Sequence, residues 1–152
     1  MSVSARLEEL GIELPQVVAP IASYAPALIV GDTVRTSGQV PLRDGVMVAT
    51  GRVGENHTSP ADAYEAAKQC ALNALAAAAD VAGGVDNIAG VIKLTGYVAS
   101  SRRFFGQPAV VNGASDLYQE IFGSLHVRSA VGVAVLPRDA SVEVEVEFAL
   151  RN

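Results

Sequence analysis

Residues 142–148 read VEVEVEF, with an apolar residue at every second position and glutamate between. Successive side chains of a β-strand point to opposite faces of a sheet, so this alternation predicts a strand with one apolar and one acidic face. The apolar face requires a covering layer, because a single sheet cannot hide it alone. Two segments with helical patterns, 60–82 and 107–122, can form that layer.

The first of these helices has start and stop signals. Ser59 precedes Pro60, a residue favoured at the first helical position, and Gly83-Gly84 follows the last helical residue. Small side chains line one stripe of this helix and allow it to lie close to a sheet. Cys70 belongs to that stripe, so we expect it in the core rather than at a reactive centre. The second helix has its apolar residues at helical spacing and ends before Gly123.

The remaining β-strands are marked by turns. Gly31-Asp32 predicts a hairpin within 27–39, and Asp44-Gly45 predicts a second turn that extends the meander. Further strands are expected over 91–99, 127–136 and 142–150, the last two joined by the turn-forming sequence PRDAS. If these two pair antiparallel through that turn, Arg128 lies opposite residues 150–152. The order is β-hairpin, α, β, α, β, β, which predicts an α+β fold with both helices on one face of a mixed sheet.

Composition limits the domain count and indicates self-association. The 152 residues suit a single domain over 1–152, in which residues 1–20, with a short helix over 3–10, form an N-terminal extension. Hydrophobic residues make up 50% of the chain and charged residues 18%, less than the roughly 25% usual in soluble domains. This balance predicts apolar surface that is covered by other copies of the chain.

Charge and motifs exclude several classes of function. A net charge of −5 disfavours nucleic-acid binding, which relies on cationic side chains to neutralise phosphates. One cysteine, the acidic pair Glu8-Glu9 near the N-terminus and the lack of any apolar run of 18 residues predict a cytoplasmic protein with no membrane segment. Neither His57 nor His126 has a second histidine or cysteine at metal-binding spacing, so we expect no metal and no cofactor.

A few polar residues are candidates for chemistry, each beside a structural alternative. Arg128 opens an apolar strand, where it either pairs with a neighbouring glutamate or holds a substrate carboxylate. Glu143, Glu145 and Glu147 share one strand face, which is either solvated or places one carboxylate in a cleft to position water. Asn112 is a helix cap, a core hydrogen-bonding residue or a ligand contact.

Together with the Ala-rich helix and its Gly-Gly end, four stretches resemble the RidA family, also called the YjgF family of reactive-intermediate deaminases. They are SGQVP at 37–41, NGASDLYQEIFG at 112–123, RSAVGVAVLP at 128–137 and VEVEVEFAL at 142–150. The resemblance implies a chorismate-mutase-like fold that assembles as a homotrimeric barrel with ligand clefts between subunits. It also implies hydrolysis of 2-enamino or 2-imino acids to 2-keto acids and ammonia, without a cofactor.

The resemblance also implies roles for particular residues. Arg128 would hold the substrate carboxylate, and Glu143 would orient the attacking water. Four further residues would bind substrate: Tyr24, Ser37, Gly38 and Asn112. We expect a trimer interface to bring Arg128, Glu143 and a neighbour's Tyr24 or Ser37 around one ligand. Two alternatives are a non-catalytic trimer that binds small carboxylate metabolites or a protein partner, and the ribonuclease activity attached to the family's name.

Overall fold

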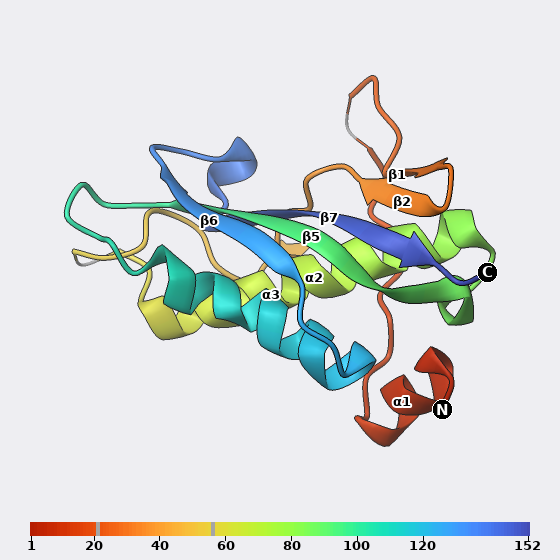
Figure 1. The fold of residues 1–152 in the computed structure, drawn as a ribbon. Helices are drawn as coiled ribbons and strands as arrows, with labels where there is room; N and C mark the ends of the chain where they lie inside the picture. Colours follow the sequence, from red (N-terminus) through yellow and green to blue (C-terminus); the bar gives the residue numbers. More distant parts are fainter. Residues whose placement is uncertain (21, 56) are drawn as a thin grey trace.

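The computed structural model describes residues 1–20, 22–55 and 57–152 (Figure 1). Its helices are α1 (Val3–Glu9), α2 (Pro60–Ala82) and α3 (Gln107–Phe122), with single 3₁₀ turns η1 (Val85–Asn87) and η2 (Pro137–Asp139). Its strands are β1 (Ala27–Val30), β2 (Thr33–Thr36), β3 (Leu42–Arg43), β4 (Val46–Met47), β5 (Ile88–Ala99), β6 (Val127–Val133) and β7 (Val142–Leu150).

The main sheet has five strands in the order β1-β2-β7-β5-β6. Only β5 and β6 run parallel, while the other neighbours are antiparallel. The long helices α2 and α3 lie together on one face, and η2 and the segment that leads into β1 lie on the other (Figure 1). The expected α+β class, with a mixed sheet and both long helices on one face, is therefore confirmed.

The two long helices begin and end where the sequence predicts. The Ser59 hydroxyl caps α2 by accepting a hydrogen bond from the Asp62 amide at 3.1 Å, and Gly83 ends the helix in a left-handed conformation with φ 79°. Gly123, with φ 71°, ends α3 in the same way. Within the described part of the chain, no helix has both the length and the apolar content needed to cross a membrane.

Strand β7 is central in the sheet, which contradicts an antiparallel pairing of β6 with β7. Strand β5 lies between them, because α3 carries the chain back so that β6 runs parallel to β5 at the sheet edge. β7 then returns on the other side of β5, against β2. The four apolar side chains of VEVEVEF are all buried, and a central position under the helices is where such a strand buries the most apolar area.

The turn at Asp44-Gly45 forms as expected, yet its strands do not extend the meander. β3 and β4 pair only with each other, as a separate two-stranded sheet with Arg43 opposite Val46. Asp44 and Gly45 both have positive φ, as a tight two-residue hairpin turn requires. The physical reason for the separation is length, since two-residue strands contribute too few hydrogen bonds to compete for the edge of the main sheet.

The core between the helices and the sheet depends on close approach. A side chain at Gly113 of α3 would place its Cβ 2.0 Å from the backbone oxygen of Tyr64, so glycine allows α2 and α3 to touch. Below them, the rings of Tyr118 and Phe148 meet edge to face at 5.6 Å. Cys70 is fully buried in α2, and burial raises the pKa of its thiol well above the usual value, as expected for a core residue.

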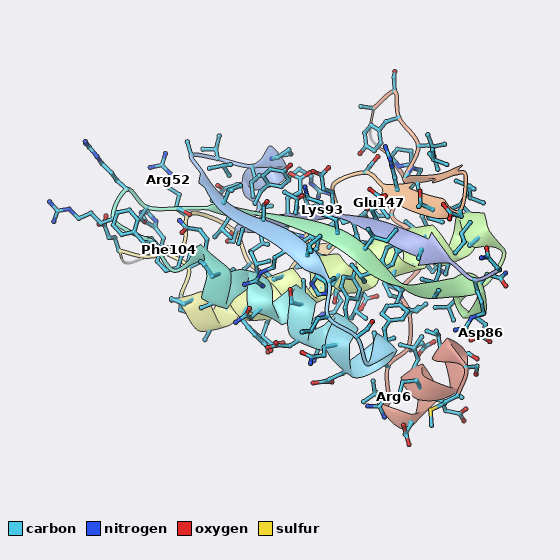
Figure 2. All side chains as sticks on the ribbon, viewed as in Figure 1. Arg6, Arg52, Asp86, Lys93, Phe104 and Glu147 are labelled. Carbon is cyan, nitrogen blue, oxygen red and sulfur yellow. The ribbon has the colours of Figure 1, made fainter. Side chains whose placement is uncertain are left out.

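Helix α1 packs onto the body of the protein instead of projecting into solvent. Val3 and Leu7 are buried in the core. Arg6 and Asp86 lie at the same end of the molecule (Figure 2), where the Asp86 carboxylate accepts hydrogen bonds from the backbone and hydroxyl of Ser4, both at 2.7 Å. The Arg6 side chain donates to the backbone oxygen of Glu120 at 2.9 Å. The N-terminal helix is thus joined to both η1 and α3.

Candidate functional site

The sheet face opposite the long helices is polar, because the glutamates of β7 point there. Lys93 and Glu147 are labelled on this face in Figure 2, where their strands place them directly opposite each other. The hydroxyl of Tyr97 donates to Glu145 at 2.6 Å, and this hydrogen bond raises the pKa of Tyr97 to about 12. We refer to this side of the sheet as the open face.

A cavity of about 520 Å³ lies at the end of the open face where η2, the segment before β1 and the segment after β2 meet. We call it the Glu143 cavity. Its lining comprises Val18, Ala19, Ala22, Tyr24, Pro26, Ser37, Gly38, Gln39, Val40, Leu42, Pro137, Arg138 and Glu143. The cavity thus combines mainly apolar walls with a few polar groups, which is typical of small-molecule sites.

Glu143 is the carboxylate of this cavity and lies directly against Gly38. A Cβ atom at position 38 would stand 2.1 Å from the Glu143 Oε1 atom, so any larger residue there would force the carboxylate to shift. The side chain is half-buried, and burial, followed by repulsion from Glu145, raises the pKa of Glu143 above its usual value. A carboxyl group with a raised pKa can take up and release a proton nearer to neutral pH than an ordinary glutamate.

The segment before β1 is tied to the floor of the cavity by Ser37. Its hydroxyl donates to the backbone oxygen of Ala25 at 2.6 Å, and its amide donates to that of Pro26 at 2.8 Å. These bonds fix the chain next to Tyr24, whose ring lines the cavity while remaining about half exposed. Gln39, which the sequence places beside the motif glycine, is buried and continues the backbone pairing with Val144.

Arg128 lies elsewhere in the chain, on the helix-covered face of the sheet. It is opposite the buried Leu94 in the pairing of β6 with β5. Its guanidinium donates to the Ser115 hydroxyl at 3.0 Å and to the backbone oxygen of Pro108 at 3.1 Å, both in α3. We call this group, with His126, the Arg128 corner. Two hydrogen bonds leave other guanidinium donors available to a ligand or a partner.

His126 supports the Ser115 hydroxyl within this corner. Its Nε2 atom is 2.9 Å from the Ser115 oxygen, which already accepts a hydrogen bond from Arg128. Which of the two atoms donates depends on the tautomer of the ring, since a neutral imidazole nitrogen can take either role. Burial, followed by the charge of Arg128, lowers the pKa of His126 and favours this neutral form. The buried Nδ1 atom has no hydrogen-bond partner among the described residues.

The residues predicted to form one site therefore divide into two groups within a single chain. The Glu143 cavity contains Tyr24, Ser37, Gly38 and Glu143. Asn112 belongs with the Arg128 corner, because residues 108, 112 and 115 follow one another along a single face of α3. Asn112 is exposed there.

Sequence reasoning missed three residues that the structure places at these two positions. Ser115 and His126 orient Arg128, and the only sequence signal for them was their closeness to the arginine along the chain. Arg138 lines the Glu143 cavity from η2. The only sequence signal for Arg138 was its place in the turn-forming sequence PRDAS. This turn leads from β6 at the edge of the sheet to the start of β7.

The described residues do not gather the ligands of a metal site, since no group of three or more histidine, cysteine, aspartate or glutamate side chains forms among them. The cavity instead offers a carboxylate with a raised pKa, a serine-anchored loop and an aromatic hydroxyl. Such groups can orient water and move protons to and from a bound molecule.

Comparison with models of known protein families assigns the chain to one of them. The model of the family described as "YjgF/chorismate_mutase-like, putative endoribonuclease" matches residues 4–148, nearly the whole length. The chain therefore belongs to the YjgF/chorismate-mutase-like family, and the RidA resemblance is confirmed at this level.

Two relatives support the assignment. Protein TCP17 of Trypanosoma cruzi is 39% identical over 153 residues, which cover 99% of this chain and 95% of that protein. A 2-iminobutanoate/2-iminopropanoate deaminase of Dermatophagoides farinae is 33% identical over 134 residues, 88% of this chain and 91% of the deaminase. The name of the second relative identifies that protein as a deaminase of small 2-imino acids.

Solved structures share the fold. Atu1372 from Agrobacterium tumefaciens, a protein of unknown function, is similar with a TM-score of 0.87 and 41% identity over 98% of this chain and 92% of its own. A "putative endoribonuclease" from Shewanella oneidensis MR-1 has a TM-score of 0.92 and 32% identity over 99% and 100% of the two chains. Escherichia coli TdcF with bound serine has a TM-score of 0.63 and 25% identity over 90% and 94%.

Proposed function

We propose that the protein hydrolyses 2-enamino and 2-imino acids to 2-keto acids and ammonia. The observation that carries the proposal is the Glu143 carboxylate, half-buried against Gly38 in a cavity and with a raised pKa. The deaminase relative, 33% identical, supports the choice of reaction. Net charge −5 gives little support to the alternative of RNA cleavage, because few cationic groups are available to neutralise phosphates.

The reaction consumes one water, and both protons of that water end on the ammonia that leaves. Enamines tautomerise to imines, and water then adds to the imine carbon as Glu143 accepts its proton. The same carboxyl group returns this proton to the nitrogen, which gives a carbinolamine. It then takes the proton of the new hydroxyl group and passes it to the nitrogen as the carbon–nitrogen bond breaks, so that ammonia leaves and the keto group forms. Holding the substrate and water in place supplies much of the acceleration, since no other chemical group is required.

We propose further that Arg128 of a second copy completes each site as the carboxylate anchor. Within one chain Arg128 and Glu143 lie on opposite faces of the sheet, so a site that used both would take one of them from a second chain. Both edges of the sheet carry exposed apolar side chains, including Val127 and Val131 on β6 and Leu28 on β1. Association of these edges in a homotrimer would cover them and would bring the two groups together.

The assembly has a direct test in sedimentation equilibrium. A homotrimer should sediment with about three times the 15.7 kDa mass of the chain. A stable monomer at micromolar concentration would remove the composite site from the proposal.

The activity is tested by ammonia release. A 2-imino acid is generated in the cuvette by an amino-acid oxidase, and its decay is followed with and without the protein. We expect faster release of ammonia and keto acid with the wild-type chain, and a rate close to the spontaneous one with Glu143→Gln. Binding of keto acids without any acceleration would instead identify a non-catalytic carboxylate-binding protein.

A further inference from the structure

Arg138 has a backbone conformation that side chains seldom adopt. Its φ is 56°, and that of the next residue, Asp139, is 58°, so two consecutive residues other than glycine are left-handed. This conformation brings the Cβ atom too close to the neighbouring carbonyl oxygen, and it persists where the surrounding structure imposes it. Such residues are concentrated at ligand sites, where they aim a side chain.

Hydrogen bonds from a neighbouring segment hold Arg138 and Asp139 in this left-handed backbone conformation. The backbone oxygen of Asp139 accepts a hydrogen bond from Gly51 at 2.8 Å, and Thr50 forms a β-bridge with Ala140. One residue further, the Ser141 hydroxyl donates to the backbone oxygen of Gly51 at 2.6 Å. The turn at η2 is thus clamped to residues 50–51, which holds Arg138 at the rim of the Glu143 cavity.

Arg138 is the only cationic residue among those that line this cavity. Arg138 is exposed, and the described residues offer no hydrogen bond or ion pair to its guanidinium, unlike that of Arg128 in its corner. An arginine held at a cavity rim without an internal partner can pair with an anionic group of a ligand through its planar fork of donors.

The size and walls of the cavity indicate what such a ligand looks like. About 520 Å³ is within the range of sites for drug-sized molecules, and the smallest 2-imino acids would leave most of it unfilled. The lining of the cavity is largely apolar, as at Val18, Ala22 and Leu42. A substrate with a hydrocarbon spacer and a second anionic end would reach from Glu143 to Arg138.

We propose that Arg138 binds a side-chain carboxylate, and that the preferred substrates are 2-imino acids with acidic side chains. The inference rests on the proposed function, in which Arg128 of a second copy holds the carboxylate next to the imine. A second cation in the same cavity then has a second carboxylate to bind. The hydrolysis itself is unchanged, with one water consumed and one ammonia released.

The first test compares imines made by amino-acid oxidases from glutamate, from its neutral isostere glutamine and from alanine. We expect the wild-type kcat/KM for the glutamate imine to exceed that for the glutamine imine by at least about tenfold. Arg138→Gln should abolish this preference and leave the alanine imine within about twofold of wild type. Arg103→Gln, which removes an exposed arginine outside the cavity, should change neither value.

A second measurement separates binding from turnover. Calorimetry with 2-oxoglutarate and with the apolar 2-oxopentanoate should show at least about tenfold tighter binding of the former, lost in Arg138→Gln. Arg138→Gly tests the same loss with a residue that adopts the left-handed turn at no steric cost, so a folding defect of the glutamine variant would not obscure the result.

Three results would overturn the inference. One is an equal loss for all three imines in the Arg138 variants, because Arg138 would then contact the group common to every substrate. Another is an unchanged preference in those variants, and the third is no wild-type preference for acidic ligands. If the wild-type chain binds 2-oxoglutarate through Arg138 but hydrolyses no imine, the acidic-ligand site stands and the proposed deaminase activity fails.

Discussion

The Glu143 cavity and the Arg128 corner contain the residues that the sequence assigns to one site, yet they differ in almost every physical respect. Glu143 faces a cavity on the open side of the sheet, and burial raises its pKa. Arg128 faces the helices, where Ser115 and Pro108 accept two of its hydrogen bonds. One region has a carboxyl group that faces a cavity, and the other has a guanidinium held in a fixed direction by hydrogen bonds.

The comparison shows how strand pairing divides a motif. Arg128, Leu94 and Val146 lie side by side across β6, β5 and β7. Glu143 is three residues from Val146, and an odd number of residues along a strand leads to the other face. A site that uses both groups therefore has to be formed between chains, which is what the exposed sheet edges suggest.

The largest expected effect is a loss of turnover when Glu143 of the cavity is replaced. Glu143→Gln keeps the shape of the side chain but removes the proton acceptor, so kcat should fall by about 100-fold or more while 2-keto acid binding is preserved. Steady-state kinetics and calorimetry measure the two quantities. Glu147→Gln, on the same strand face and paired with Arg35, is the matched control and should keep kcat within about twofold. A normal kcat in Glu143→Gln would mean that the cavity is not the reaction centre.

The second largest expected effect is weaker ligand binding when Arg128 is replaced. Arg128→Ala removes a bidentate carboxylate contact worth about 1.5–3 kcal/mol, so keto-acid binding should weaken roughly 10- to 100-fold. Arg128→Lys retains the charge without the planar fork and should give an intermediate loss. Unchanged affinity in Arg128→Ala would show that the cavity binds its ligand without the corner.

A substitution at Gly38 tests whether the position of the Glu143 carboxylate in the cavity matters for turnover. Its replacement by alanine would put a methyl group 2.1 Å from the Glu143 Oε1 atom, and the flexible carboxylate would have to move by about an ångström. Displacement on that scale can cost a factor of 10 to 100 in rate, so we expect kcat to fall by about tenfold with little change in Tm. Gly90→Ala, whose nearest neighbour is 3.7 Å away, is the control and should leave kcat unchanged. If Gly38→Ala retained full activity, the contact with Glu143 would have no catalytic role.

The smallest effect concerns stability. Because burial raises the pKa of Glu143 in the folded state, the native protein pays a cost for the charged carboxylate at neutral pH. That cost lessens as pH falls through the folded pKa and is gone below the ordinary glutamate value of about 4.3. Glu143→Gln should therefore have a higher Tm than wild type at pH 7, with a gap that closes towards pH 4. A lower Tm at neutral pH would indicate that the charged form is stabilised by a partner.

Local sequence signals predicted the elements of the fold well. Residues 60–82 and 107–122 became helices with those bounds, because Ser59, Gly83 and Gly123 specify their ends through short-range hydrogen bonds and left-handed conformations. VEVEVEF also specified which face of β7 is buried. These features depend on neighbours along the chain, which a sequence displays directly.

Strand partners and side-chain directions at the site could not be predicted in the same way. The alternation of β7 indicates its faces but not that β5 separates it from β6, since this depends on a competition between distant strands. The motif therefore grouped Arg128 with Glu143, although the pairing directs them to opposite sides. Arg138 was missed because nothing in PRDAS specifies two left-handed residues.

Subunit mixing tests most directly whether a site combines Glu143 of one chain with Arg128 of another. Arg128→Ala and Glu143→Gln chains, each with little activity alone at substrate concentrations well below KM, would be mixed in equal amounts, unfolded and refolded together. Random assembly would give about one quarter of the sites both intact residues, so about a quarter of wild-type ammonia release should return. Activity that stays at the level of the separate variants would contradict the composite site.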